Sequence, residues 1–230
     1  MAFGISFTNL SMQQLGRWEL VSFVGLDNYI TIFEDSVFRK SITNTFYYVI
    51  IGVPAVILVS FFLAYLLHSG GEKKIFSFFR AVFYSPSVTN MVAISIVWLL
   101  ILSVWKNMGL NMLIFLAALQ SVPRELYEAS SLDGAGKWKQ LVKITLPNIG
   151  FSIFFVTVTT LIGWFQYFEE VYVMTEGGPV NSTISMTYYI YRTGFWSSRF
   201  GQAAAASVIL FAFIMIATLI QLRVQTRSDD

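Results

Sequence analysis

The chain has 230 residues, of which 56% are hydrophobic and 12% are charged, against about 45–50% and about 25% in ordinary soluble domains. A soluble fold cannot hide so much apolar surface, and the apolar residues come in long blocks, so the sequence predicts an integral membrane protein. The formal net charge of +2 is too small to suggest nucleic-acid binding, and the lack of cysteine excludes disulfides, thiolate metal sites and cysteine nucleophiles.

Residues 1–41 mix charged and aromatic side chains, and we expect an extracytoplasmic N-terminal segment with short helices. The block 42–67 carries no charge and is long enough to cross a bilayer as a helix, since about 20 apolar residues suffice. Pro54 lies inside this block. We expect a kink there, because neighbouring helices in a membrane can satisfy the carbonyl group that proline leaves free.

Residues 81–122 contain one charged residue, Lys106, and as a single helix they would be about 60 Å long, which exceeds one bilayer thickness. We therefore expect two spans, 81–105 and 107–122, with a turn at Lys106 and Asn107 between them. The second of these spans is short by the same arithmetic.

A polar stretch, 123–147, interrupts the apolar blocks, and two further charge-free spans, 148–168 and 201–222, follow it. Between these spans, 169–199 is polar and aromatic and is punctuated by glycine and proline, as expected of a connection. The whole chain, 1–230, is therefore predicted to be a single all-α domain, a polytopic bundle of transmembrane helices with about five spans.

Basic residues orient this bundle, because cytoplasmic loops of membrane proteins carry an excess of lysine and arginine. Placing the loops 68–80 and 123–147 and the C-terminal tail inside assigns nine basic residues to the cytoplasm and five to the outside. The inner set is Lys73, Lys74, Arg80, Arg124, Lys137, Lys139, Lys143, Arg223 and Arg227, and the outer set is Arg17, Arg39, Lys40, Arg192 and Arg199. This orientation puts the N-terminus outside.

A motif in the central polar stretch points to function. It reads Glu128-Ala129-Ser130-Ser131-Leu132-Asp133-Gly134 and continues to Ile144-Thr145-Leu146-Pro147. This pattern resembles the cytoplasmic Glu-Ala-Ala motif of binding-protein-dependent ATP-binding-cassette importer permeases, in which a glycine and then Ile-x-Leu-Pro follow the triplet. Ser130 stands where the motif has its third alanine, a small-for-small exchange that a tightly packed helix surface should tolerate.

The physical properties of this stretch agree with the role that the resemblance implies. One short helix can contain Glu125 and Glu128 and end at Gly134, and a second can run from Lys137 to Ile144. Such a pair would present a compact knob to a groove on a separate ATPase. The residues that the resemblance implies for this coupling are Glu128, Ala129, Ser130, Asp133, Gly134, Ile144, Leu146 and Pro147. Without the resemblance, the stretch would be interpreted as a solvated connector.

A second likeness concerns the solute. Residues 174–183 and 188–195 resemble the carbohydrate-type branch of the same family, which implies a sugar or sugar-like solute. Aromatic faces suit sugar rings and amides bind hydroxyl groups, so the candidates for the solute path are Trp164, Gln166, Tyr167, Asn44 and Asn90. The alternatives are an interfacial aromatic belt for the aromatic residues and hydrogen bonds between helices for the asparagines.

The resemblance also implies the partners and the location. The partners are ABC ATPase subunits, a homologous sister permease, an extracytoplasmic solute-binding protein and the lipid membrane, with the chain crossing the bacterial plasma membrane several times. Residues 134–137 lack the spacing of a phosphate-binding loop, so ATP and Mg²⁺ are expected on the partner ATPase. No catalytic residue, metal ligand or cofactor is expected on this chain.

Two other classes of function stay open at this point. An ion-coupled secondary transporter would need carboxylates near the membrane midplane, and a membrane-embedded enzyme would need clustered acids, histidines or metal ligands. The proposed spans contain no Asp or Glu, and the chain has one histidine, so the importer is favoured. Family members usually carry an earlier span and a few tens of residues between the counterparts of Leu100 and Ile101, so we also expect a fragment or an internally deleted form.

Overall fold

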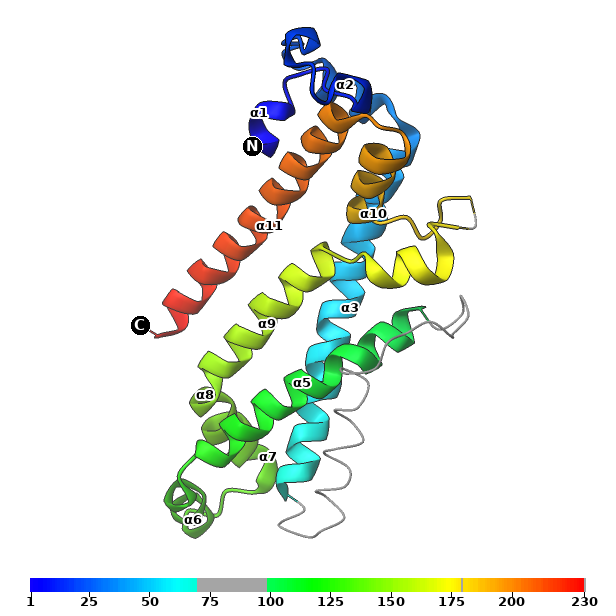
Figure 1. Cartoon of the computed structure of the whole chain (residues 1–230). Coiled ribbons are helices and arrows are strands. Elements are labelled where there is room, and N and C mark those ends of the chain that lie inside the picture. The colour runs from blue at the N-terminus through cyan, green and yellow to red at the C-terminus, as the bar shows by residue number, and fades with distance from the viewer. Residues whose placement is uncertain (70–98, 179, 230) are drawn as a thin grey trace. The chain divides into compact units, whose positions relative to one another are not determined.

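The computed structural model describes residues 1–69, 99–178 and 180–229 (Figure 1). These residues divide into two compact units. The first unit comprises 1–51, 99, 161–178 and 180–229, and the second comprises 52–69 and 100–160.

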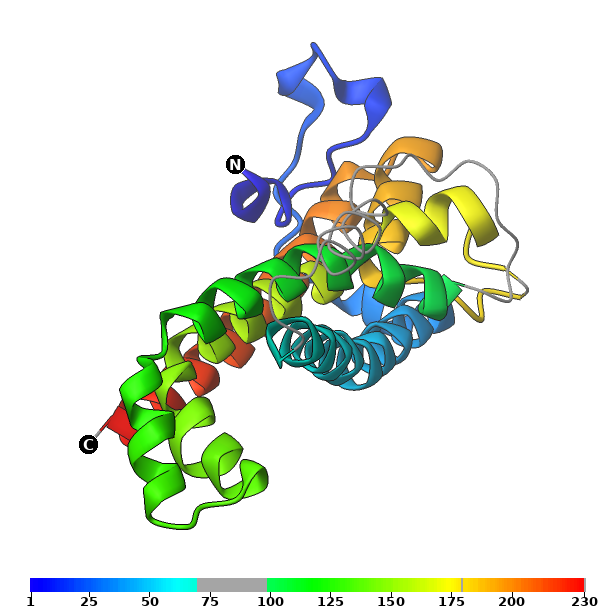
Figure 2. The ribbon, with the colours of Figure 1, turned by 90° about the horizontal axis from the view of Figure 1, so that it is seen from below.

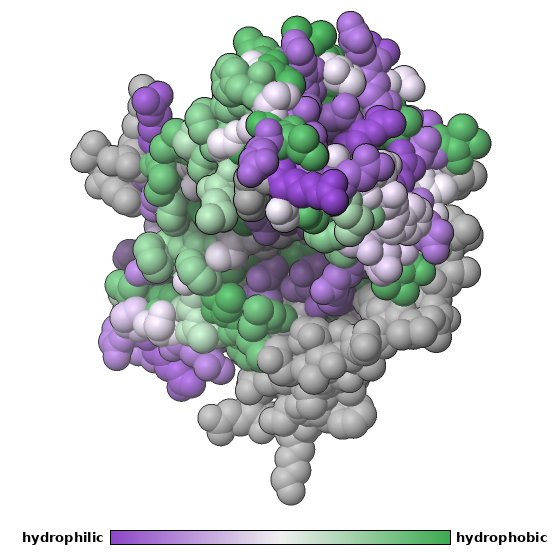
Figure 3. Space-filling model, turned by 45° about the horizontal axis from the view of Figure 1, so that its top comes forward, coloured by the Kyte–Doolittle hydropathy of each residue, from purple (hydrophilic) through white to green (hydrophobic). Residues whose placement is uncertain are grey.

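The first unit combines short helices with the ends of long ones. In chain order these are α1 (Ala2–Ile5), the 3-10 turns η1 (Met12–Gln14) and η2 (Trp18–Leu20), α2 (Asp27–Glu34), the start of α3 (Ser36–Ser69), the π-helical turn η6 (Val171–Thr175), α10 (Met186–Tyr191), the π-helical turn η7 (Arg192–Trp196) and α11 (Phe200–Asp229). The helices α1, α2 and α10 all pack against α11. Figure 3, in which the end that carries α2 comes forward, shows hydrophilic and hydrophobic residues intermixed.

Asp35 fixes the start of α3. Its Oδ1 accepts a hydrogen bond of 2.8 Å from the backbone N–H of Val37, which satisfies one of the free amide groups at the helix start. Its Oδ2 accepts a second bond, also of 2.8 Å, from the hydroxyl of Tyr189 in α10. Burial, and then this hydrogen bond, raise the pKa of the Tyr189 hydroxyl above its usual range. One carboxylate therefore joins the start of α3 to α10.

A stripe of side chains on α3 holds the loop that precedes α10. Lys40, Asn44 and Tyr48 are spaced four residues apart, so they lie on one face of the helix. They donate hydrogen bonds of 2.9 Å each to backbone carbonyls of the loop, from Lys40 Nζ to Val180, from Asn44 Nδ2 to Ile184 and from Tyr48 Oη to Thr183. The loop is thereby tied to successive turns of α3.

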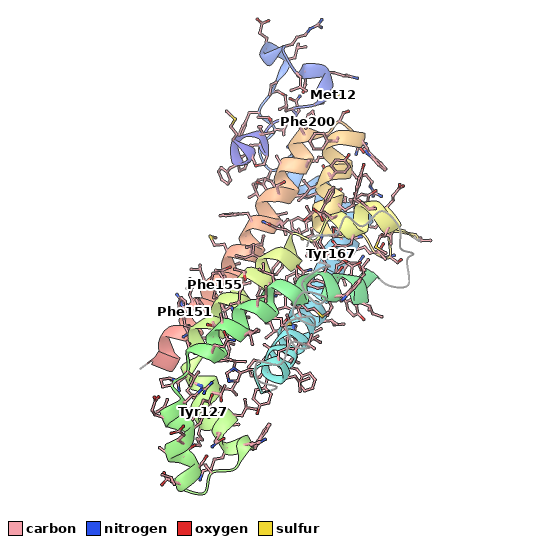
Figure 4. All side chains as sticks on the ribbon, turned by 60° about the horizontal axis from the view of Figure 1, so that its bottom comes forward. Met12, Tyr127, Phe151, Phe155, Tyr167 and Phe200 are labelled. Carbon is pink, nitrogen blue, oxygen red and sulfur yellow. The ribbon has the colours of Figure 1, made fainter. Side chains whose placement is uncertain are left out.

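The start of α11 packs tightly against the N-terminal segment. The amide of Asn28 donates to the carbonyls of Ser6 and Thr8 at 2.8 Å each, and the backbone N–H of Gly201 donates to Leu10 at 3.1 Å. A Cβ on Gly201 would overlap the carbonyl oxygen of Thr8 and would lie 2.8 Å from Asn28 Nδ2. Glycine is therefore required for this approach. Figure 4 labels Met12 and Phe200, which lie near each other at this contact.

The second unit is built around one apolar core. Its elements are the rest of α3, α5 (Leu99–Ser121), α6 (Arg124–Leu132), α7 (Lys137–Gln140), the π-helical turn η5 (Leu141–Thr145), α8 (Leu146–Asn148) and α9 (Gly150–Phe165), whose last turn belongs to the first unit. The core residues are Ala64, Leu67, Met112, Phe115, Leu116, Leu119, Val122, Ile149 and Val156. Asn111 Nδ2 donates a buried hydrogen bond of 3.1 Å to Thr160 Oγ1, which links α5 to α9 and satisfies a polar group on each helix.

Three helices among the described residues are long and apolar enough to cross a membrane, and a fourth span results if one bent pair is counted. α3 contains the block 42–67, with Pro54 inside the helix, and α11 contains the block 201–222. The bent pair contains most of 148–168. The number of about five spans is not reached within the described residues, and the expected span 81–105 lies largely outside them.

The turn expected at Lys106 and Asn107 is wrong. α5 runs through both residues as one helix. The Asn107 side chain donates to the carbonyl of Ser103 at 2.8 Å, four residues earlier in the same helix. An asparagine that bonds within its own helix and a single lysine do not end a helix when no proline follows. The limits expected for the span 107–122 therefore do not correspond to a separate helix.

Gly201→Ala should destabilise the first unit. Overlap with Thr8 and Asn28 is expected to cost about 1–3 kcal/mol, the usual range for forcing a group into a packed site. The measurement is the thermal stability of the purified protein in detergent, together with tryptic cleavage at the exposed Arg17, which should become faster. Gly163→Ala is the control, because a Cβ there meets no atom within 4 Å. Equal stability of the two variants would contradict the tight approach.

Asn44→Ala should loosen the loop before α10. Val180 has a φ of 51°, which strains a β-branched residue, and the bonds from α3 hold it there. Losing the bond to Ile184 should speed amide hydrogen exchange in 181–186 about fivefold, as expected for one net hydrogen bond. Thr43→Ala is the matched control, since among the described residues the hydroxyl of Thr43 bonds its own helix, at the carbonyl of Arg39. Unchanged exchange in Asn44→Ala would refute the role of the stripe.

Candidate functional site

The polar stretch 123–147 folds as short helices joined at Gly134, and we call it the two-helix knob (the green helices at the lower left of Figure 2). α6 follows directly on Pro123 and ends in a Schellman turn. In this turn the N–H of Gly134 donates to Ser131 at 3.1 Å, and the N–H of Ala135 donates to Ser130 at 2.9 Å. Gly134 has a φ of +74°, which only glycine adopts without strain.

The second half of the knob is one helical stretch that bends into α9. α7, η5 and α8 follow each other without a loop, and the stretch 137–148 meets α9 at an angle of 69°. The break lies at Ile149, and Pro147, two residues earlier, has no N–H to continue the hydrogen-bond ladder, which weakens the helix beside the break. The side chain of Asn148 donates to the carbonyl of Ile144 at 2.7 Å and so satisfies a group at the break.

Side chains on one face of α6 hold the second half in place. Gln140 Nε2 lies 3.0 Å from Ser130 Oγ and 2.9 Å from Ser131 Oγ. The hydroxyl of Tyr127, labelled in Figure 4, shares a hydrogen bond of 2.9 Å with the hydroxyl of the buried Thr145. Tyr127, Ser130 and Ser131 are three and four residues apart, so they point the same way from α6.

The knob also exposes large apolar side chains. Leu132, at the end of α6, is 91% exposed, and Trp138, in α7, is 77% exposed. α6 carries Glu125 and Glu128 together with Arg124, and the second half carries lysines at 137, 139 and 143. An exposed tryptophan and leucine beside these charges form a surface suited to protein contact.

The predicted coupling residues divide into two groups in the structure. Exposed members are Glu128, Ala129, Asp133, Gly134 and Pro147, and half-buried members are Ser130, Ile144 and Leu146. Several of them shape the knob, since Gly134 makes the turn, Ser130 accepts a hydrogen bond from Gln140 and Pro147 lies two residues before the bend.

Sequence reasoning missed Leu132, Trp138, Gln140 and Tyr127. Two large apolar residues inside an otherwise polar stretch were a usable signal for the first pair. Neither Gln140 nor Tyr127 had such a signal, because their partners are set by how the helices pack.

The solute-path candidates lie in several different settings. The side chain of Asn44 donates a hydrogen bond to the carbonyl of Ile184 and so stabilises the fold. Asn90 lies outside the described residues. Trp164 and Tyr167 are 3% and 5% exposed, and their rings stack with centroids 5.2 Å apart. Gln166 is exposed. The structure therefore brings Trp164 and Tyr167 together but leaves Gln166 apart from their stack.

The sequence matches a known family over residues 33–229, and this family is described as the binding-protein-dependent transport system inner membrane component. The chain is 30% identical to the lactose transport system permease protein LacF of Rhizobium radiobacter, over 90% of this chain and 82% of that protein. It is 31% identical to the sn-glycerol-3-phosphate transport system permease protein UgpA of Escherichia coli, over 87% of this chain and 79% of that protein.

A third relative bears on the length of the chain. The chain is 30% identical to the arabinooligosaccharides transport system permease protein AraP of Bacillus subtilis, over 95% of this chain and 81% of that protein. That alignment extends over 260 residues, more than the 230 of this chain, so AraP carries residues with no counterpart here. This agrees with the expectation that family members contain residues that this chain lacks.

Solved structures agree on the fold. A crystal structure of a bacterial ABC transporter involved in the import of the acidic polysaccharide alginate contains a chain similar to this one, with a TM-score of 0.78. The likeness covers 98% of this chain and 88% of that chain at 20% identity. A second structure, of the alginate transporter in complex with an alginate pentasaccharide-bound periplasmic protein, gives a TM-score of 0.74 at 22% identity, over 94% of this chain and 87% of that chain. With the family match covering most of the sequence, the chain belongs to the family of binding-protein-dependent transport system inner membrane components and is a multi-pass membrane protein.

Proposed function

We propose that this chain is the permease subunit of an ATP-binding-cassette importer that carries a sugar or sugar-like solute across the bacterial plasma membrane. Family membership supports an importer over an ion-coupled transporter or a membrane-embedded enzyme. The relatives LacF, UgpA and AraP are named for lactose, sn-glycerol-3-phosphate and arabinooligosaccharides, which supports a solute rich in hydroxyl groups. Trp164 and Tyr167 stay candidates for stacking on such a solute.

The observation that carries the coupling part of the proposal is the two-helix knob with its exposed Leu132 and Trp138. One large apolar side chain from each helix can fill a groove on an ATPase subunit, and such central apolar residues usually provide most of the binding energy of an interface. The lysines at 137, 139 and 143 would then face an acidic rim. ATP and Mg²⁺ bind to the ATPase in this proposal, and this chain performs no covalent chemistry.

The bend at Ile149 suggests how movement passes into the membrane. When two ATPase subunits close on ATP, the knob moves with them, and α9 continues from the knob at an angle of 69°. The movement would rock α9 and switch the solute pathway between inward-facing and outward-facing states. The solute passes between this chain and a homologous sister permease, and an extracytoplasmic binding protein delivers it. One of the similar solved structures contains a periplasmic protein bound to alginate pentasaccharide, which supports the last step.

Trp138→Ala and Leu132→Ala should each weaken binding of the ATPase. Truncating an exposed apolar residue that fills a pocket is expected to lower the affinity about 30-fold, corresponding to about 2 kcal/mol. The measurement is a titration of the purified ATPase against the complex of this permease with its sister permease in detergent. Trp196→Ala is the control, because Trp196 is also an exposed tryptophan but lies in η7, outside the knob. Equal affinities of the three variants would refute docking at the knob.

Gly134→Ala should impair coupling while Gly136→Ala should not. A Cβ meets no atom within 4 Å at either glycine, so the two positions differ in backbone conformation only. Alanine at Gly134 is expected to cost about 1 kcal/mol, because the φ of +74° is strained for any residue with a Cβ. Co-purification of the ATPase with each variant measures the effect. Loss of the ATPase from both variants, or from neither, would argue against a role for the Gly134 turn.

A further inference from the structure

Gln140 joins the two halves of the knob through a single amide group. We propose that Gln140 is a positioning residue that, together with Ser130 and Ser131, locks α6 against α7 so that the knob has its docking shape before an ATPase binds. We call these three side chains the amide lock. The inference deepens the proposed docking and rests on it, while the lock itself can be tested on the permease without an ATPase.

The hydrogen bonds of the lock have a consistent direction. Ser130 Oγ and Ser131 Oγ donate to the carbonyl of Tyr127 at 2.9 and 2.8 Å, which uses the one hydrogen of each hydroxyl. Each hydroxyl oxygen therefore has only lone pairs left to offer. The Gln140 amide has two N–H groups, and Nε2 lies within 3.0 Å of both hydroxyl oxygens. The two N–H groups can donate one bond to each hydroxyl oxygen, and Nε2 also lies 3.3 Å from the carbonyl oxygen of Tyr127, so all its nearby acceptors belong to α6.

Ser130 gains a role from this geometry. It stands at the third position of the Glu-Ala-Ala motif, where alanine would offer no oxygen to Gln140. Ser130 and Gln140 are half-buried, so water competes with their hydrogen bond less than at a fully exposed site. The exchange of alanine for serine is therefore matched by an amide donor on the opposite helix, and serine here does more than fill the space of alanine.

Without the lock, the knob would have two points at which to pivot. Gly134 and Gly136 separate α6 from α7, and a Cβ at either would meet no atom within 4 Å, so no close packing surrounds these two positions. Among the described residues, the side-chain hydrogen bonds that join α6 to α7 come from Gln140, and the Tyr127 to Thr145 bond forms a second brace farther along. Holding a binding surface in its bound shape raises affinity, because less conformational entropy is lost on docking.

The lock can be tested by measuring a distance across the knob. Because the chain contains no cysteine, Arg124→Cys and Lys139→Cys can carry spin labels at two exposed positions, one on α6 and one on α7. The distance distribution is measured on the complex with the sister permease, without ATPase. A single narrow distribution is expected with Gln140 present. Gln140→Leu, which keeps helix propensity but removes the donors, should broaden it.

Serine variants separate the lock from a general loss of folding. Ser130→Ala combined with Ser131→Ala keeps Gln140 and should broaden the distribution as Gln140→Leu does. Ser131→Thr keeps the hydroxyl and is the matched control, for which the distribution should stay as narrow as in the wild type. Equal melting temperatures of all variants establish that the bundle is intact. If the distance distribution of Gln140→Leu is as narrow as that of the wild type, the lock is refuted.

The affinity for the ATPase tests whether the lock prepares the knob for docking. Gln140→Leu should weaken the titrated affinity about fivefold, as expected when one net hydrogen bond no longer holds the competent shape. Broadening of the distances without any change in affinity would overturn this preparation. If the wild-type permease pair binds no ATPase, the proposed function fails, and the distance distributions still decide whether the lock exists.

Discussion

The hydrocarbon core of a membrane offers no water to a peptide group, and this constraint underlies the architecture of the chain. Each backbone N–H and C=O that enters the bilayer has to find its partner within the protein, which favours long uninterrupted helices such as α3, α5 and α11. Polar side chains in such helices follow the same rule. Asn107 bonds a carbonyl of its own helix and Asn111 bonds a hydroxyl of α9, so α5 continues through positions at which a polar residue in water would often mark a turn.

The same constraint explains where the helices are interrupted. In the second unit the breaks fall at Gly134, inside the polar stretch, and at Ile149, two residues after its end, where carbonyl groups can be satisfied by side chains or by water. The Schellman turn after α6 and the bond from Asn148 to Ile144 provide two of those partners. Two breaks close together create a compact projection, and the bonds from Gln140 and Tyr127 prevent it from being a flexible connection.

In the first unit, too, side chains satisfy the carbonyl groups of an irregular segment. The loop before α10 contains residues with left-handed φ, including Val180 and Asn181, and its carbonyl groups would be poorly satisfied on their own. Side chains from one face of α3 supply donors at regular intervals, and Asp35 secures the start of that helix against Tyr189. In both units an irregular segment is held by side chains that a regular helix presents at three-residue and four-residue intervals.

Composition and local pattern by themselves determined the membrane environment, the all-α class and the family. These conclusions depend on near neighbours in the chain: apolar blocks without charge, a glycine that can take a positive φ at Gly134, and a motif of fixed spacing. The end of α6 at Gly134 could be predicted for the same reason. The prediction of a turn at Lys106 was wrong, because a polar residue in the sequence does not show whether its side chain forms hydrogen bonds within its own helix.

Tertiary structure decided what each candidate side chain touches. Asn44 could have faced a solute or another segment, and only packing brought it to Ile184, which is 140 residues away in the chain. The sequence likewise did not decide the role of Trp164 and Tyr167, and only the tertiary structure shows that their rings stack on each other in the interior. The partners of Gln140 depend on the angle between α6 and α7. Sequence spacing determines which side of a helix a residue occupies, but the element that meets that side is set by the packing of the whole unit.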